Sequence, residues 1–349
     1  MKKKIDIRQL SLEQLTDEIV KLGEKPYRAR QVHQWLWKKR AIDFDQMTNL
    51  SKSFRKLIEN NFIINALVLS EAQISSDKTI KNAFLLADNS VIEGVLIPTK
   101  KRMTACVSVQ VGCSLDCAFC ATGKLKRVRN LNADEIYDQV VMINDQSQKE
   151  YSIPISNIVY MGMGEPLLNY KNVLLSVDRI TSEDGLGMSA KRITISTAGI
   201  HKKIIRLADD KVKFNLALSL HAANDEKRNK IMPINVSNSL NSLKEAMIYF
   251  SEMTGTRPTL EYIIFKDFND EITDAEELVQ FAKSFPSKIN IIEYNSIDEG
   301  KYQQATVKKV DAFASYLESK NLIVNIRRSR GKDIDAACGQ LANKNELAR

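Results

Sequence analysis

The chain has 349 residues, of which 44% are hydrophobic and 27% are charged. This composition is ordinary for a folded globular protein and excludes intrinsic disorder, which goes with fewer apolar residues. A chain of this length can bury a large core, so its stability requires neither disulfides nor a structural metal. Lysine and arginine exceed aspartate and glutamate by 51 to 43. That excess suits a polyanionic partner such as nucleic acid, although charge alone fits a merely basic protein equally well.

Neither a targeting segment nor a membrane span is recognisable in the sequence. The basic residues between Met1 and Arg8 are not followed by the apolar stretch of a signal peptide. Nowhere do about 18 apolar residues run without interruption, as a membrane-spanning helix requires. We therefore expect a cytoplasmic protein, monomeric and without a membrane partner.

The first 64 residues are expected to form a small helical domain. Ser11 is a suitable N-cap, and Gln14 three residues later completes a capping box. Two further helices are predicted over residues 29–37 and 52–60. From residue 66 to residue 111 the pattern changes to short alternating runs, which predict antiparallel strands, the last of them over residues 106–111. We assign residues 65–105 to a β-strand extension.

Beyond Gly112, strand-like and helix-like segments alternate almost to the C-terminus. Strands are predicted at residues 158–161, 192–196, 214–220, 259–265, 288–293 and 323–327. Helices are predicted at residues 132–148, 169–180, 240–251, 274–284 and 307–319. Asn132 caps the first of these helices, with Glu135 at its third position. This alternation is typical of the α/β class, with a parallel sheet covered by helices, either open or closed into a full or partial barrel.

Polar or glycine-rich tails follow most of these strands, which favours the barrel. Examples are Gly162-Met163-Gly164-Glu165-Pro166, Ser196-Thr197-Ala198-Gly199, Ser219-Leu220-His221 and Glu293-Tyr294-Asn295. Barrel enzymes collect their active-site residues at the C-terminal ends of the strands, so these tails would meet at one mouth. We expect residues 106–349 to form a partial (β/α) barrel core with a C-terminal catalytic loop.

Three of the five cysteines form a compact motif. Cys113, Cys117 and Cys120 have the spacing C-x3-C-x2-C, with Phe119 before the last cysteine. Thiolates this close on one loop can hold three irons of a 4Fe–4S cluster and leave the fourth iron without a protein ligand. An open coordination position is how a metal centre takes up a substrate. The motif therefore predicts a catalytic iron–sulfur cluster.

A zinc site is the alternative for these cysteines. Zinc prefers four ligands, commonly arranged as two pairs, and this motif supplies three thiolates. The three histidines of the chain, His33, His201 and His221, all lie far from the motif in sequence. Ligand number and spacing therefore favour iron–sulfur over zinc.

The motif and the Gly162–Pro166 tail together resemble the radical-SAM superfamily. Within it, the chain resembles the ribosomal large-subunit methyltransferase N (RlmN) family over nearly its whole length. Three features carry the closer match: Cys106 before the cluster motif, the run Ser219-Leu220-His221-Ala222, and the run from Arg330 through Cys338 to Leu341. The resemblance implies a radical-SAM fold, a 4Fe–4S cluster and S-adenosylmethionine as cofactors. It also implies cofactor contacts by Gly164, Glu165, Ser196, Ser219, Leu220, His221 and Asn295.

The two outlying cysteines gain roles from the resemblance. By themselves, free cysteines are usually buried and inert. Cys338, however, follows a polar run whose Arg327, Arg328, Arg330 and Lys332 would favour its thiolate. In the family the cysteine matching Cys338 is methylated by one S-adenosylmethionine, and cleavage of a second supplies the radical that activates this methyl group for addition to adenine. The cysteine matching Cys106 then resolves the protein–RNA adduct and leaves a disulfide.

Glu93 matches a family position that acts as a proton acceptor. A carboxylate among apolar neighbours is a typical candidate for proton transfer. By pattern alone it would instead be a solvent-facing strand residue, and only the resemblance favours the catalytic role.

Basic runs are expected to hold RNA phosphates around the site. One run follows the cluster motif, one precedes Cys338, and a third surrounds Trp35 and Trp37, which are themselves expected in the core of an RNA-binding accessory domain. The residues are Lys124, Lys126, Arg127 and Arg129; Arg327, Arg328, Arg330 and Lys332; and Lys25, Arg28, Arg30, Lys38, Lys39 and Arg40. An adenine must leave its stack to react, so an unpaired or strained nucleotide is expected.

The resemblance implies methylation of adenine carbon 2 in 23S ribosomal RNA and in transfer RNA beside the anticodon. It also implies an electron-donating reductase of the flavodoxin type. A sister family that methylates carbon 8 shares the cysteine framework and stays an alternative, although the match in the N-terminal domain favours carbon 2. A non-catalytic zinc module that binds RNA is the alternative from another class.

Overall fold

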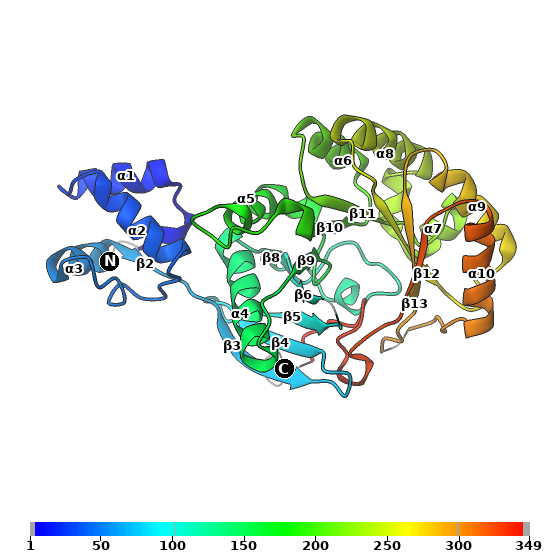
Figure 1. The fold of residues 1–349 in the computed structure, drawn as a ribbon, viewed down its shortest axis with the longest axis horizontal. Coiled ribbons are helices and arrows are strands. Elements are labelled where there is room, and N and C mark those ends of the chain that lie inside the picture. Colours follow the sequence, from blue (N-terminus) through cyan, green and yellow to red (C-terminus); the bar gives the residue numbers. More distant parts are fainter. Residues whose placement is uncertain (1–3, 101, 299, 345–349) are drawn as a thin grey trace.

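The computed structural model describes residues 4–100, 102–298 and 300–344. Its centre is a ten-stranded sheet in the order β14-β13-β12-β11-β10-β9-β6-β5-β4-β3. Within the described chain, β14 and β3 form separate edges, so the sheet stays open. Figure 1 shows the sheet curved, with α6, α8, α9 and α10 on its outer side and the N-terminal helices at one end. The predicted partial (β/α) barrel is confirmed.

In the main sheet, β6 and the strands from β9 to β14 run parallel, and apolar residues of β9 to β13 are buried. In register, Ile195 lies between Tyr160 of β9 and Leu216 of β11, and all three are almost fully buried. Parallel strands are buried in this way because helices cover the sheet. The parallel strands are β6 (Met103–Cys106), β9 (Asn157–Tyr160), β10 (Ile193–Thr197), β11 (Asn215–Ser219), β12 (Thr259–Ile264), β13 (Lys288–Glu293) and β14 (Val324–Arg327).

Helices connect these strands, and amphipathic patterning predicts most of them. α8 and α10 begin at the predicted residues, and Asn132 with Glu135 caps α4 as predicted. The helices are α4 (Ala133–Tyr151), α5 (Tyr170–Thr181), α6 (His201–Asp209), α7 (Asp225–Ile231), α8 (Leu240–Thr254), α9 (Ile272–Ala282) and α10 (Val307–Ser319). Short 3-10 turns are η1 (Ile7–Gln9), η2 (Ala121–Lys124), η3 (Pro166–Asn169), η4 (Ala190–Arg192), η5 (Pro233–Ser237) and η6 (Lys332–Ile334).

The N-terminal part contains α1 (Leu12–Lys21), α2 (Tyr27–Trp37) and α3 (Lys52–Asn61). The Ser11–Gln14 capping box forms as predicted. β1 (Ile5–Asp6) pairs with β2 (Phe62–Ile63), which closes the two ends of this part on each other. Trp37 is buried, as expected, and Trp35 is half-buried.

Arg8 joins the N-terminal part to α4 through Asp138 at 2.8 Å and Asp134 at 3.2 Å. The first three residues of the basic N-terminus lie outside the described chain.

The antiparallel strands β3 (Val68–Ile74), β4 (Ile80–Leu85) and β5 (Val91–Pro98) extend the same sheet, because β5 pairs with β6. The predicted last strand over residues 106–111 is wrong. The strand ends at Cys106, and the Val109 amide then donates to Met163 in the tail of β9. Gln110–Val111 forms β7, which pairs with β8 (Arg129–Asn130) outside the main sheet. No helix of the described chain is long and apolar enough to cross a membrane.

Candidate active site

A cavity lies at the C-terminal ends of the parallel strands, where the sequence predicts a mouth. Tails of β9, β10 and β11, the cysteine loop and the C-terminal segment all contribute to its wall. The predicted site residues on this wall are Cys113, Cys117, Cys120, Gly164, Glu165, Ser196, Ser219, His221 and Cys338. The fold therefore brings together groups that are spread over more than half of the sequence.

The cysteine loop is closed by its own backbone. Gly112 has φ +73°, and a Cβ there would lie 2.2 Å from the Lys126 carbonyl oxygen, so only glycine fits this approach. The Cys113 amide donates to the Leu125 carbonyl at 3.2 Å, and the Cys120 amide to the Cys117 carbonyl at 3.1 Å. Burial raises the pKa of the Cys113 and Cys117 thiols. All three cysteines are free thiols, half-buried on the cavity wall.

These three thiols suit a cluster better than a single ion. Within the described residues, no group of three or more His, Cys, Asp or Glu side chains could hold one metal ion. In a cubane cluster each thiolate binds its own iron, so the thiols need not converge on one point. All three thiols line the cavity, so a cluster held by them would be accessible to a ligand bound there. The donor set therefore fits a 4Fe–4S cluster.

Glu165 is a buried acceptor at the end of the β9 tail. Its Oε1 accepts from the Leu167 amide at 2.9 Å and from Thr197 Oγ1 at 2.7 Å, and its Oε2 accepts from the Ala198 amide at 2.7 Å. Burial raises the pKa of this carboxyl, and the three hydrogen bonds oppose the rise. A carboxylate oxygen can accept two hydrogen bonds. Oε2 therefore keeps capacity for a cationic ligand in the cavity.

Gly164 allows this tail to pack on Gln110. It has φ +95°, and a Cβ there would lie 2.5 Å from Gln110 Cβ. Gln110 Oε1 accepts from the Glu165 amide at 2.9 Å, while Gln110 Nε2 donates to Asn130 at 2.8 Å. The conformation of Gly164 and this amide bridge together fix the backbone that carries Glu165.

Two hydroxyls and an imidazole lie along the neighbouring strand ends. Ser196 Oγ and Ser219 Oγ are 3.2 Å apart and join β10 to β11. His221 Nδ1 accepts from the Ile263 amide at 3.1 Å, which places the proton of the neutral ring on Nε2. Burial, followed by the charge of Arg228, lowers the pKa of His221 to about 3. His221 is therefore a neutral hydrogen-bond donor at physiological pH.

Leu220 and Asn295, two of the predicted cofactor residues, are not among the residues that line the cavity. Leu220 is fully buried, and its carbonyl oxygen accepts from Arg228 Nε at 3.0 Å. Asn295 Nδ2 donates to the Cys338 carbonyl oxygen at 3.2 Å, and its Oδ1 is buried without a partner among the described residues. In this structure Asn295 supports the loop that carries Cys338. Its unsatisfied oxygen is free to accept from a ligand or a water.

Cys338 and Cys106 lie near one another. Cys106 is at the end of β6, buried, with its pKa raised to about 12 by burial and then by the charge of Cys338. The Cys338 thiol is open to the cavity, yet the surrounding protein raises its pKa, and Arg327 only partly offsets this. The expected lowering by four cations is therefore wrong. Arg328 and Lys332 pair with Glu293, and Arg330 pairs with Asp77.

Glu93 is buried in β5 and is not a solvent-facing residue. Its Oε2 accepts from the Ala342 amide at 2.9 Å and from the Asn343 amide at 3.1 Å, while Lys81 Nζ lies 3.7 Å from Oε1. In this conformation Glu93 anchors the segment that follows Cys338. Its role as a proton acceptor stays a prediction.

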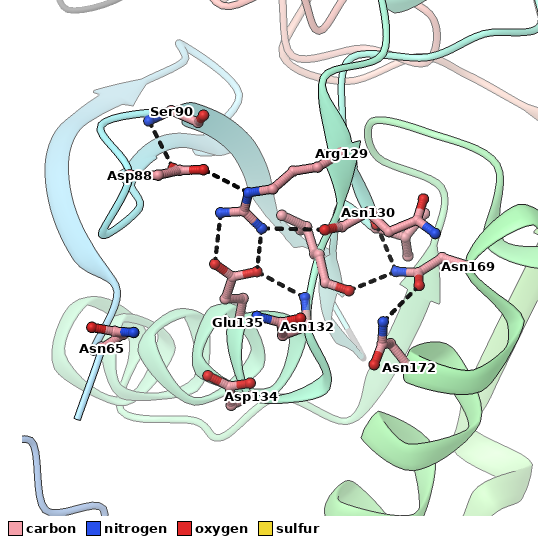
Figure 2. Close-up of polar contacts among 12 residues, drawn as sticks. Asn65, Asp88, Ser90, Arg129, Asn130, Asn132, Asp134, Glu135, Asn169 and Asn172 are labelled. Carbon is pink, nitrogen blue, oxygen red and sulfur yellow. Dashed lines mark hydrogen bonds and ion pairs between the residues drawn. The ribbon is translucent and has the colours of Figure 1, made fainter. Parts of the chain in front are cut away.

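Arg129 belongs to a structural network and not to a free basic run (Figure 2). Its guanidinium forms two hydrogen bonds of 2.8 Å with Glu135 at the start of α4 and one of 2.6 Å with Asp88. Glu135 also accepts from the Asn132 amide at 2.7 Å, and this bond completes the cap of α4. The network fixes β8 against the sheet. Lys124, Lys126 and Arg127 line an open pocket that the cluster loop also borders.

Sequence reasoning missed two charged residues of the site, Glu261 and Arg228. Glu261 and Arg327 lie on the cavity wall and pair at 3.6 Å, and Asn290 donates to Glu261 at 2.8 Å. A lone carboxylate within the apolar run Thr259–Phe265 was the signal for Glu261. Arg228 is fully buried beneath the wall. It lies on a short polar helix and gave no comparable signal.

Comparisons with known proteins agree with this geometry. Residues 5–64 match the "Ribosomal RNA large subunit methyltransferase N-terminal domain", and residues 107–282 match the "Radical SAM superfamily". A "Probable dual-specificity RNA methyltransferase RlmN" from Cytophaga hutchinsonii is 59% identical over 98% of this chain and 94% of its own. A second protein of the same description, from Christiangramia forsetii, is 56% identical over 98% of this chain and 97% of its own.

A solved structure also matches closely. It is described as a radical SAM methyltransferase from Sphaerobacter thermophilus, with a TM-score of 0.91 and 36% sequence identity over 97% of this chain and 99% of that chain. The N-terminal match, the superfamily match and the near-full-length identity all point to one family. The chain therefore belongs to the RlmN family of radical-SAM methyltransferases.

Proposed function

We propose that this enzyme methylates carbon 2 of adenine in 23S ribosomal RNA and in transfer RNA beside the anticodon. The proposal rests on one observation above all: the three-cysteine loop, the Glu165 acceptor and the Cys338 thiol share a single cavity. Two relatives are named as dual-specificity RNA methyltransferases, and this name supports the proposal of two classes of RNA substrate. The proposed site of action is the cytoplasm, and the proposed working form is a monomer.

Cys113, Cys117 and Cys120 would hold the 4Fe–4S cluster, which supplies one electron to S-adenosylmethionine when both are bound. Glu165 Oε2 would accept from the ammonium group of the methionine moiety, a charge-assisted hydrogen bond. Ser196, Ser219 and the Nε2–H of His221 offer polar contacts for the rest of the cofactor. The apolar wall around them, which includes Ile263 and Ile292, limits access of water.

Cys338 is the proposed methyl acceptor, and Cys106 the residue that resolves the adduct with RNA. Arg327 interacts electrostatically with both thiols and is fixed by Glu261. A fixed cation stabilises whichever of the two is a thiolate. Adenine carbon 2 lacks the nucleophilicity for ordinary methyl transfer, so the methyl group must first be activated as a radical on the cysteine.

The proposed RNA contacts use basic residues next to the cysteine loop and on the N-terminal domain. Lys126 and Arg127 lie at the open pocket next to Cys113, and the N-terminal domain presents Arg30, Lys38 and Lys39. Phosphate contacts of this kind position the strand without reading its sequence. An electron donor of the flavodoxin type is the proposed partner for reduction of the cluster.

The methylation of Cys338 should depend steeply on pH. Desolvation by the surrounding protein raises the pKa of this thiol above its usual value near 9, so the thiolate is a small fraction at neutral pH. Below the pKa, each pH unit increases the thiolate about tenfold. We therefore expect the initial rate of Cys338 methylation to rise about tenfold per unit between about pH 6 and 8. Peptide mass spectrometry of quenched samples measures this rate, and a flat profile would contradict the expectation.

Product analysis tests the proposed function directly. The protein is purified without oxygen, its cluster is reconstituted, and it is incubated with S-adenosylmethionine, dithionite and unmodified ribosomal or transfer RNA. Mass spectrometry of the digested nucleosides should show 2-methyladenosine. 8-Methyladenosine would instead assign the chain to the activity of the sister family. A colourless, zinc-loaded protein without methylated product would refute the proposal.

A further inference from the structure

Arg228 of α7 is a cation buried without a direct anionic partner. It is 0% exposed. Its guanidinium donates to the carbonyl oxygens of Ala198 at 2.6 Å, Ser219 at 3.1 Å and Leu220 at 3.0 Å, and to Asn235 Oδ1 at 2.6 Å. All four acceptors are neutral. None of the ion pairs formed between described residues includes Arg228.

The carboxylate of Asp225 is connected to Arg228 through the side chain of Asn235. Asn235 Nδ2 donates to Asp225 Oδ1 at 2.7 Å, and Asp225 Oδ1 also accepts from the Leu240 amide at 3.0 Å. Asn235 thus stands between the guanidinium and the anion. Burying a charge without a partner carries a large desolvation cost even after the protein relaxes. In keeping with this cost, burial lowers the pKa of Arg228 to about 10.

The cysteine loop is packed against the helix that carries this cation. α7 ends at Ile231, whose carbonyl oxygen accepts from the Ala118 amide at 3.0 Å, directly after Cys117. The four hydrogen bonds fix the guanidinium, so it cannot move toward solvent. A positive charge is therefore held on the helix whose end contacts the cysteine loop.

We propose that Arg228 is the buried counter-charge of the iron–sulfur cluster and raises its reduction potential. The inference rests on the proposed function, because it needs the cluster on Cys113, Cys117 and Cys120. Reduction adds one electron from the external donor to the cluster, and no bond or proton changes. A fixed cation in a low-dielectric interior stabilises the more negative, reduced form more than the oxidised form.

The test compares Arg228→Gln with Arg228→Lys in the reconstituted full chain. Reduction is followed by electron paramagnetic resonance during titration with dithionite and mediators. Removing the charge in Arg228→Gln should lower the equilibrium constant for reduction at least about tenfold, which for one electron is a shift of 59 mV. Arg228→Lys keeps the charge but loses the forked hydrogen bonds, so its potential should stay nearer to that of the parent.

Arg8→Gln is the matched control for loss of a buried arginine. Arg8 is also buried, but it pairs with Asp134 and Asp138 at the N-terminal domain. This variant should lose stability and keep the parent potential. A second design keeps the total charge: Asn235→Asp with Asp225→Asn moves the carboxylate next to Arg228 and should also lower the potential. If Arg228→Gln does not fold, the reduction potential of the double variant tests the inference in its place.

The outcomes are distinguishable. A reduction constant changed less than about twofold in Arg228→Gln, or in the double variant, would overturn the inference, even if binding of S-adenosylmethionine weakened. That result would leave Arg228 with a purely structural role in joining the ends of β10 and β11. A parent chain that takes up no iron would refute the proposed function and this inference with it.

Discussion

Replacing Cys338 with alanine is expected to abolish methylation of RNA, with a loss of about 10⁴-fold or more, as for other residues that act as covalent nucleophiles. The residue is the proposed acceptor of the methyl group, and the thiol open to the cavity lies on the same wall as the cysteine loop. Alanine removes the sulfur and leaves no other group there to receive the methyl. Nucleoside mass spectrometry after multiple turnovers measures the loss. The iron content should equal that of the parent.

Cys106→Ala is the matched variant, because it removes the other outlying thiol. Cys106 is buried behind Cys338 at the end of β6. This variant should still add to RNA but fail to release it, so a covalent protein–RNA adduct should accumulate on denaturing gels. Cys338→Ala should form no adduct. Substantial methylation by Cys338→Ala would contradict the proposed route, and an adduct formed by both variants would show that another residue carries the methyl group.

Glu165→Gln should weaken binding of S-adenosylmethionine by roughly 10- to 150-fold. A charge-assisted hydrogen bond contributes about 1.5–3 kcal/mol, and the glutamine amide loses it. The amide keeps one acceptor oxygen, so its NH2 group must face either the Ala198 amide or the Leu167 amide with Thr197, all of them donors that Glu165 satisfies. We therefore expect a loss of stability of about 1–3 kcal/mol as well. Equilibrium binding to the reconstituted enzyme measures the affinity, and thermal unfolding measures the stability.

Glu135→Gln separates these two effects. Glu135 is likewise a buried carboxylate with several hydrogen bonds, but it pairs with Arg129 at the start of α4 (Figure 2). Its loss should destabilise the fold and leave the affinity for S-adenosylmethionine unchanged. If both variants weaken binding equally, the effect comes from lost stability and the proposed contact of Glu165 with the ammonium group is wrong.

Local sequence signals are enough to predict the class of fold and the location of the active site. Alternating apolar runs and caps such as Ser11 and Asn132 are local signals, and these set most helices and parallel strands. The cysteine motif identified its own loop, because three ligands close in sequence need no help from the fold. The strand-end tails were sufficient to place Gly164 and Glu165 near the mouth, since parallel strands end at one edge.

Which charged side chains face the site, and which are already paired, follows from the three-dimensional fold. Arg129 looked like part of a free basic run, but Asp88 and Glu135, from separate segments, neutralise it. The cations before Cys338 were expected to lower its pKa, yet burial outweighs Arg327 and the other cations pair elsewhere. Arg228 gave no signal at all. Burial and ion pairing join residues that are far apart along the chain, and their energies depend on that three-dimensional neighbourhood and not on local pattern.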